Sequence, residues 1–396
     1  MNQALSNWAR RLLLVAVAVC VAAAAMALDL RQQAAYFSGS LFAPLSSVAL
    51  LPAQAIWPLM RTPQSLTGPL TLKASGFIPQ PPGAPAAHAS TLLALPANDA
   101  DVVQAFWFAG RKENAPDVQI AMSAYNRAKQ QWTAPRFVVN RQAVVRFLGY
   151  RLRRIGNPVV WRDTLGRNHL FVVANFMGGW ASSRILHLRQ GATNDENADF
   201  APLRTLPLSW FWNYSFLVRS LPLQLADGGM MLPVYFELGR YYPMALRFDG
   251  NGEFRGMTRI STEPTALQPT LVARSASEWL AFMRSSADGA HKVQVARTSD
   301  GGRHWEDLPP LRLDNYDSSV IGLALCPGRM ILAYNPSVGR SSLTLAQSGD
   351  GLDWRRVTTL EQSEDDGKKH ESSYPAMAWA DDGLWISYTH ERRAIV

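Results

Sequence analysis

The chain has 396 residues, of which 47% are hydrophobic and only 18% are charged, and its formal net charge is +8. This composition provides for a sizeable core and excludes general disorder. The mildly basic charge favours anionic partners, such as acidic glycans or an anionic membrane surface. No basic run is interleaved with aromatic residues, so we expect no nucleic-acid partner.

Residues 1–28 have the pattern of a targeting segment. Arg10 and Arg11 precede an uncharged apolar run of 17 residues, 12–28, and Ala25-Met-Ala27 has the small-x-small form of a cleavage site. Seventeen residues is the lower limit for a membrane-spanning helix, so two outcomes are open: a cleaved signal peptide, or a signal anchor that tethers the protein to the membrane. Because the positive flank stays in the cytoplasm, we predict export of the remainder to the periplasmic or extracellular side.

Residues 29–87 are expected to link this segment to the main domain. From Gln32 to Met60 there is no charged residue, and three prolines break any long helix. This apolar stretch either lies on a membrane interface or a partner, or packs as a strap on the outside of the following domain; we favour the strap. The Pro-rich residues 76–87 mark the predicted domain boundary.

From residue 88 to residue 396 the pattern is that of β-strands. Short apolar or alternating runs, bounded by Gly, Pro, Asn or Asp, recur throughout, and no long amphipathic helix is evident among them. The clearest runs span residues 91–95, 102–108, 118–122, 170–174, 230–236, 279–283, 320–325 and 330–334. We therefore predict an all-β domain over residues 88–396, preceded by one apolar helix.

Two turns of the same design begin at residues 298 and 348. In Thr298-Ser-Asp-Gly-Gly-Arg-His-Trp305, the hydroxyl and the carboxylate can bond the turn's own N–H groups, and the glycines allow φ > 0. Ser348-Gly-Asp-Gly-Leu-Asp-Trp354 keeps this order with one residue fewer. A repeat of about 40–50 residues is typical of the four-stranded blades of a β-propeller, and residues 88–396 provide for about six blades. A β-sandwich is the main alternative fold.

The two turns resemble the Asp-boxes of the sialidase superfamily. Residues 333–345, which contain Arg340, lead into the second turn, and Ser373-Tyr-Pro375 and residues 382–389 follow it. This order is similar to the last third of a sialidase, and more closely to the sialidase-like BNR-repeat proteins known as predicted neuraminidases. The resemblance implies a six-bladed β-propeller.

The resemblance also implies a site in which three arginines bind a substrate carboxylate, an Asp is the acid/base, and a Tyr beside a Glu is the nucleophile. A neutral Tyr suits such a substrate because it is not repelled by the carboxylate, and arginine can bond a carboxylate bidentately. The matching clamp positions are Arg284 and Arg340, the latter shortly after Asn335. Asp117 matches the acid/base and Tyr374 the nucleophile.

Two positions depart from the family pattern. The first arginine of the triad is missing near His88, and either His88 or Arg111 is a candidate substitute. The position of the Glu that activates the tyrosine holds Gln268, and an amide cannot accept a proton. Glu371 or Glu237 could serve in its place.

We therefore expect an exported glycoside hydrolase acting on acidic glycans of the sialic- or uronic-acid type. A catalytically inactive propeller that binds glycans or assembles with a partner is the alternative, favoured by Gln268 and the missing arginine. A third possibility is a lyase acting on uronic acids, with His88 and a tyrosine as acid and base. The sequence has no metal or cofactor motif and does not indicate the oligomeric state.

Overall fold

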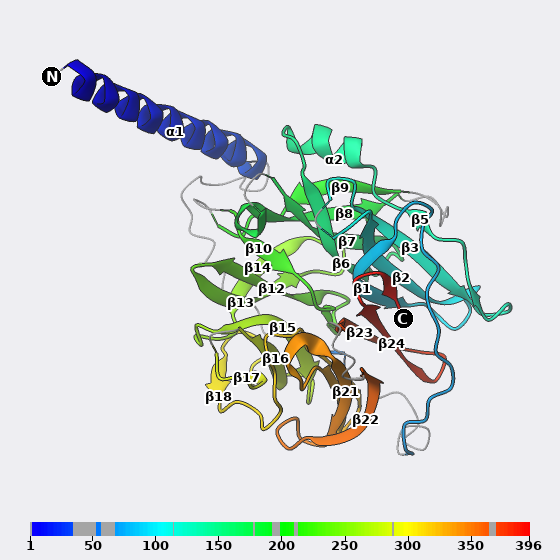
Figure 1. Ribbon diagram of the computed structural model, residues 1–396. Helices are drawn as coiled ribbons and strands as arrows, with labels where there is room; N and C mark the ends of the chain where they lie inside the picture. The colour runs from blue at the N-terminus through cyan, green and yellow to red at the C-terminus, as the bar shows by residue number, and fades with distance from the viewer. Residues whose placement is uncertain are drawn as a thin grey trace.

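Six antiparallel sheets follow one another along residues 86–395 and form a six-bladed β-propeller (Figure 1). This computed structural model describes residues 2–34, 53–56, 68–113, 115–176, 179–191, 199–209, 213–286, 289–363 and 370–396. One long helix, α1 (Asn2–Ala34), precedes the sheets and extends away from them (Figure 1). The prediction of an all-β propeller behind an N-terminal apolar helix is confirmed.

The blades are numbered here in chain order. Blade 1 comprises β1 (Ala86–Ala94), β2 (Asp101–Gly110), β3 (Gln119–Asn126), β4 (Gln131–Trp132) and β5 (Arg136–Phe137), and blade 2 comprises β6 (Arg154–Arg162), β7 (Asn168–Asn175), β8 (Ser183–Gln190) and β9 (Phe200–Thr205). Blade 3 comprises β10 (Phe216–Val218), β11 (Leu223–Gln224), β12 (Met230–Leu238), β13 (Arg240–Phe248) and β14 (Phe254–Arg259), and blade 4 comprises β15 (Ala266–Ala273), β16 (Trp279–Ser285), β17 (Gln294–Thr298) and β18 (Glu306–Leu308). Blade 5 comprises β19 (Ile321–Cys326), β20 (Arg329–Tyr334), β21 (Ser342–Ser348) and β22 (Arg355–Gln362), and blade 6 comprises β23 (Ser372–Ala380), β24 (Gly383–His390) and β25 (Ala394–Ile395).

The apolar core is divided among the interfaces between neighbouring blades. Six clusters of buried side chains each join two successive blades, and the one that contains Trp107 of blade 1 and Ala378 of blade 6 completes the ring. The strands are therefore apolar on both faces, which explains the near-continuous hydrophobic runs in the sequence. A short helix, α2 (Arg141–Leu148), joins blades 1 and 2 and is capped by Asn140.

The ring is also closed through the backbone. Blade 6 has three strands of its own, and Ile78, from the segment before blade 1, pairs with Ile395 on β25. The N–H of Ile78 donates to the carbonyl of Ile395 at 2.8 Å. Because a propeller can exclude water from its core only when its first and last blades meet, this pairing completes the fold.

The two Asp-box turns occupy equivalent places, as predicted. Each connects the third and fourth strands of its blade, β17 to β18 in blade 4 and β21 to β22 in blade 5. In the first turn the carboxylate of Asp300 accepts backbone N–H bonds from Arg303 and His304, both at 3.0 Å, and the hydroxyl of Thr298 accepts one from Gly302 at 3.1 Å. Asp350 and Ser348 make the corresponding bonds in the second turn.

A third turn of this kind was missed in the sequence. Asp249 lies in the turn that connects β13 to β14, at the same place in blade 3. Its carboxylate accepts bonds from the backbone N–H groups of Asn251 and Glu253, both at 2.9 Å. Phe254 stands where the other two turns have tryptophan. The turn therefore keeps the carboxylate that organises its backbone, but not the aromatic residue that makes the motif recognisable.

Only part of the predicted strap falls within the described residues. Residues 53–56 lie across blades 3 and 4: the N–H of Ala55 donates to the carbonyl of Ala276 at 2.7 Å, and the N–H of Ile56 donates to that of Gln224 at 2.9 Å. A side chain on Gly301 would meet the carbonyl oxygen of Ala53, so these residues pack tightly on the first Asp-box. Residues 35–52 and 57–67, which make up most of the predicted strap, lie outside the described residues.

The described side chains of α1 are exposed, including those of Trp8, Leu12 and Leu14. Searched over its described residues, the chain has no helix whose length and apolar character meet the requirement for crossing a membrane.

Candidate active site

One end of the propeller carries a ring of left-handed backbone positions. Six residues other than glycine, one at or shortly before the first strand of each blade, have φ between 44° and 64°: Ala89, Asn157, Ser215, Gln268, Asp317 and Tyr374. In blades 1, 2, 4 and 6 the strand register shifts at this point, which marks a β-bulge. Such positions cost about 1–3 kcal/mol each and collect at functional sites. This end of the channel is therefore the candidate active site.

Tyr374 lies at the bulge of β23 and is surrounded by cations. The guanidinium carbons of Arg219 and Arg340 lie 5.2 and 5.5 Å from the centre of its ring. Burial alone would raise the pKa of Tyr374, but the charges of Arg284 and Arg340, followed by a hydrogen bond with Gln268 and the charge of Arg219, lower the pKa below its ordinary value. A phenol with a lowered pKa is suited to act as a nucleophile.

Gln268 lies between two tyrosines. Its Nε2 donates to the hydroxyl of Tyr235 at 3.1 Å, and its side chain also helps to lower the pKa of Tyr374. Burial raises the pKa of Tyr235 well above its ordinary value, whereas that of Tyr374 is lowered. The residue at the position where the family has Glu is therefore next to the predicted nucleophile, but it contributes an amide instead of a proton acceptor.

Arg284 and Arg340 are held on the same residue of blade 5. The Nη2 of Arg284 lies 2.7 Å from the carboxylate of Asp317, and the Nη2 of Arg340 donates to the backbone carbonyl of Asp317 at 2.9 Å. Each guanidinium has five N–H groups, so these bonds leave donors available to a ligand. Asp317 itself was not identified from the sequence.

Glu371 fixes two arginines. One carboxylate oxygen accepts a bond from the Nη1 of Arg340 at 2.9 Å, and the other accepts one from the Nε of Arg392 at 2.7 Å. Burial opposes ionisation, but the bonds from Arg392 and Ser373 and the charge of Arg340 outweigh it and lower the pKa of Glu371 to about 2. A carboxylate with so low a pKa is a weak proton acceptor at neutral pH, so its contacts suit positioning better than proton transfer.

Glu237 is the more suitable candidate for proton transfer. It is half-buried on β12, two residues after Tyr235, so the two side chains lie on the same face of the strand. Burial raises its pKa, the positive charge of Arg284 opposes this, and the negative charge of Asp317 adds to it. A carboxyl group with a raised pKa beside the clamp can hold a proton closer to neutral pH.

Asp117 and Arg111 lie on the loop between β2 and β3. The Nε of Arg111 donates to the carboxylate of Asp117 at 2.9 Å, and their side chains are 71% and 36% exposed, respectively. Burial would raise the pKa of Asp117, but the bonds to its carboxylate, the one from Arg111 first, lower it. Glu113, on the same loop, pairs with Arg392, which links the loop to the Glu371 network. No hydrogen bond in the described part of the chain joins Asp117 to Tyr374.

His88 and Asn335 are buried in the walls of the site. The ring of His88 meets that of Tyr374 edge-on, 4.4 Å between centres, and burial, followed by the charge of Arg392, holds its pKa well below its usual value. His88 is therefore a neutral neighbour of the predicted nucleophile. The Nδ2 of Asn335 donates to the backbone carbonyls of Ser342 and Ser372, both at 2.7 Å, and so holds blade 5 to blade 6.

Arg219 was missed in the sequence. It follows β10 directly, and its side chain is buried at the centre of the ring, where it donates to carbonyls of blades 1 and 6. One signal was available, because Arg219 ends the apolar run 216–218 just as Arg284 ends the run 279–283. Without a known turn beside it, that signal is too common to single the residue out.

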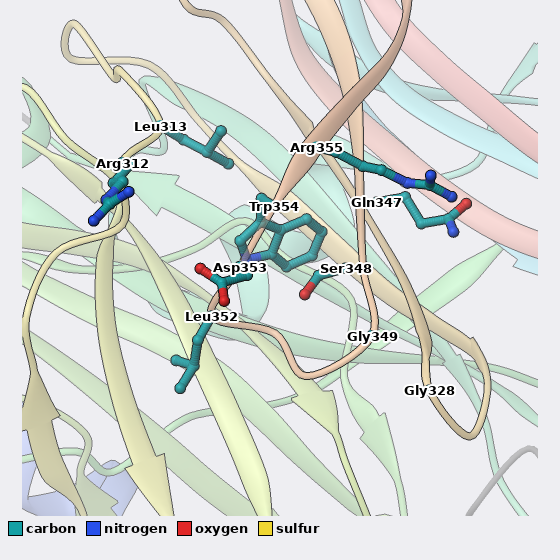
Figure 2. A pocket seen from close by; sticks show the side chains of 10 residues that line it. All are labelled: Arg312, Leu313, Gly328, Gln347, Ser348, Gly349, Leu352, Asp353, Trp354 and Arg355. Carbon is teal, nitrogen blue, oxygen red and sulfur yellow. The ribbon is translucent and has the colours of Figure 1, made fainter.

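A hollow of about 540 Å³ lies elsewhere, beside the second Asp-box (Figure 2). Its lining includes Gly328, Ser348 and Trp354. Gly328 and Ser348 lie at the ends of β20 and β21 opposite to those that adjoin Arg340, so the hollow is separate from the candidate site. Over the described residues, no group of three or more His, Cys, Asp or Glu side chains is arranged to hold a metal ion.

A family model described as a BNR repeat-like domain matches residues 102–386. No match to the chain was found among curated proteins. Several solved structures share the fold. The Hadza microbial sialidase Hz136 superposes with a TM-score of 0.64 at 14% identity, covering 79% of this chain and 65% of its own.

Two further structures support the same fold. A protein of unknown function from Dyadobacter fermentans has a TM-score of 0.61 at 11% identity and covers 80% of this chain and 93% of its own. The NanB sialidase of Streptococcus pneumoniae has a TM-score of 0.58 at 12% identity, with 83% and 69% covered. This chain spans 65% of the length of the Hadza sialidase and 53% of that of a Trypanosoma rangeli sialidase mutant. At these identities the likeness concerns the fold alone.

Proposed function

Because this chain belongs to the BNR repeat-like domain family, and because its fold is that of sialidases, we propose that it is a glycoside hydrolase acting on glycans that end in an acidic sugar. The observation that carries the proposal is the arrangement around Tyr374: a phenol of lowered pKa, with two arginines held beside it on Asp317. A carboxylate sugar supplies the anion for which this arrangement has donors.

The reaction proposed has two steps. Arg284 and Arg340 bind the substrate carboxylate, and Tyr374, as the phenolate, attacks the anomeric carbon as the bond to the leaving group breaks. A carboxyl group donates a proton to the leaving oxygen; Asp117 is the candidate by resemblance and Glu237 by its raised pKa. Water then releases the sugar from the tyrosine, and the same carboxylate takes the proton from the water.

A catalytically inactive glycan-binding propeller is the second candidate, and Gln268 favours it. The amide of Gln268 occupies the place of the proton acceptor, so Tyr374 has no paired base of the family type. The clamp residues are unaffected by this change. An inactive protein would therefore still bind an acidic sugar through Arg284 and Arg340.

The test is a panel of chromogenic glycosides: a sialoside, a glucuronide and a neutral galactoside. We expect release from an acidic substrate by the wild type, and none by Tyr374→Phe, which lacks only the oxygen. Binding of an acidic sugar without turnover would establish the binding propeller instead. Formation of an unsaturated uronate from a 4-linked oligouronide, added to the panel because elimination expels the sugar at O4, would establish a lyase. Absence of both binding and turnover would refute the acidic-glycan proposal.

We further propose that residues 1–28 direct export, which would place the propeller where it meets glycans. Arg10 and Arg11, ahead of the uncharged run 12–28, support this proposal.

A further inference from the structure

Arg219 is a buried guanidinium whose contacts join three blades. From the end of β10 in blade 3, its Nη1 donates to the carbonyl of Ser90 in blade 1 at 3.2 Å, and its Nη2 donates to that of Pro375 in blade 6 at 2.8 Å. Each acceptor directly follows a left-handed residue, Ala89 with φ 52° and Tyr374 with φ 54°. Arg219 thus fastens two bulges across the channel, one of which carries the predicted nucleophile.

The charges around Tyr374 do not balance without a further anion. Of its three arginines, Arg284 pairs with Asp317 and Arg340 with Glu371. Among the described residues no carboxylate pairs with Arg219, and its Nε is buried without a hydrogen-bond partner. A fully buried cation is costly unless an anion accompanies it. A group able to become one is the phenol of Tyr374, whose ring centre lies 5.2 Å from the guanidinium carbon.

The identity of residue 268 explains why a cation beside Tyr374 matters for the proposed reaction. In a tyrosine–glutamate pair, the carboxylate takes the proton of the phenol when the phenol attacks. Here the neighbouring group is an amide, which can donate to a phenolate but cannot take its proton. The proton of Tyr374 must then pass to a group other than residue 268, and the phenolate is stabilised by the surrounding cations.

We propose that Arg219 is a positioning residue for Tyr374: it holds the Tyr374–Pro375 bulge in place and provides a positive charge that favours the phenolate in a site where an amide replaces the carboxylate. This inference rests on the proposed function only for the role of Tyr374 as nucleophile. Ionisation of Tyr374 is a property of the free protein. It can therefore be measured without any substrate.

The other groups that face Tyr374 differ in their effect on its ionisation. Neutral His88 contributes no charge, and Arg284 and Arg340 favour the phenolate. Tyr235, the second phenol in contact with Gln268, stays protonated because burial raises its pKa. Burial lowers the pKa of Arg219 to about 10, although Tyr374 and Tyr235 act to raise it, so Arg219 remains a cation at neutral pH.

The experiment follows phenolate formation by ultraviolet absorbance in the full-length protein. The chain has 11 tyrosines, so the titration of Tyr374→Phe is subtracted from that of the wild type to isolate one group. We expect this difference to titrate below the ordinary tyrosine pKa of about 10. Arg219→Met should move it upward, and Arg219→Lys, which keeps the charge but not the fork, should restore most of the shift.

Arg255→Met is the matched control, because the side chain of Arg255 is 61% exposed and pairs with Asp249 in the turn of blade 3. It should leave the Tyr374 titration unchanged. The proposal is overturned if the titration is the same in Arg219→Met as in the wild type, or if Tyr374 titrates at or above the ordinary value in the wild type. The second criterion applies even if Arg219→Met fails to fold. A low-titrating Tyr374 in a protein that hydrolyses no acidic glycoside would refute the proposed function while leaving the role of Arg219 intact.

Discussion

Replacing Arg340 with alanine should weaken the binding of an acidic sugar by about 10- to 150-fold. The guanidinium lies beside Tyr374 and is 15% exposed, so its remaining N–H groups face a partly dehydrated site. Loss of one charged hydrogen bond to a carboxylate costs about 1.5–3 kcal/mol, which corresponds to that change in Kd. Arg340→Lys should recover only part of the loss, because lysine lacks the planar fork.

The change should leave the propeller folded. Glu371, which bonds Arg340 at 2.9 Å, keeps both of its bonds to Arg392 and is therefore not left as an unpaired buried charge. The carbonyl of Asp317 loses its 2.9 Å bond, at a cost of about 1–3 kcal/mol of unfolding free energy. Thermal unfolding separates this loss of stability from the loss of binding.

Calorimetric titration with sialic acid, glucuronic acid and galactose would measure the effect. Galactose, which has no carboxylate, should not distinguish the variants, and Arg255→Ala should bind all three sugars as the wild type does. If Arg340→Ala and Arg340→Lys both bind the acidic sugars with wild-type affinity, then Arg340 serves only to hold Glu371 and Asp317, and the carboxylate clamp is refuted.

Three further predictions concern stability and location. Burial, followed by the charge of the neighbouring His169, holds the pKa of His187 well below 6.5 in the folded protein. Unfolding therefore takes up a proton, and stability should fall as pH drops below about 6.5. In urea unfolding, His187→Gln should show a smaller difference in unfolding free energy between neutral and acidic pH than the wild type, and an unchanged difference would contradict the assignment. Asp350→Ala should lower the free energy of unfolding by about 2 kcal/mol, because the bonds from N–H groups of the turn to its carboxylate are lost. Asp353→Ala in the same turn should change the free energy of unfolding by less than about 0.5 kcal/mol. Equal effects of the two variants in thermal melts would show that the carboxylate of Asp350 does not organise the turn. A reporter fused after Val396 should be active only on the exported side, and cytoplasmic activity would end the export proposal.

The fold was predictable because its signals are local. Thr298, Asp300 and Gly302 bond one another within a single turn, so their order in the sequence is sufficient to identify it. The spacing of the two turns then set the blade length. The turn at Asp249 escaped notice because Phe254 replaces tryptophan, although the carboxylate makes the same backbone bonds.

The site was only partly predictable because its contacts join distant segments. Tyr374 and Gln268 are more than a hundred residues apart and meet only because the first strands of their blades line the same central channel. The sequence indicates their residue types but not the partner of Arg284, because Asp317 looks like any polar loop residue until the loop is folded. The role of Arg219 depends on its contacts with blades 1 and 6, and no local sequence pattern indicates those contacts.

The pairing of Ile78 with Ile395 determines which step of folding must come last. Successive blades can pack on one another as the chain is synthesised, because each interface joins neighbours in sequence. The contact that closes the ring joins almost the whole length of the propeller, so it bears the largest loop-closure entropy and is of the kind that slows folding. It cannot form before residue 395 has been made. Since Arg219 bonds blade 6 as well as blade 1, the surroundings of Tyr374 are completed only at that final step, and a nascent chain carries no finished site.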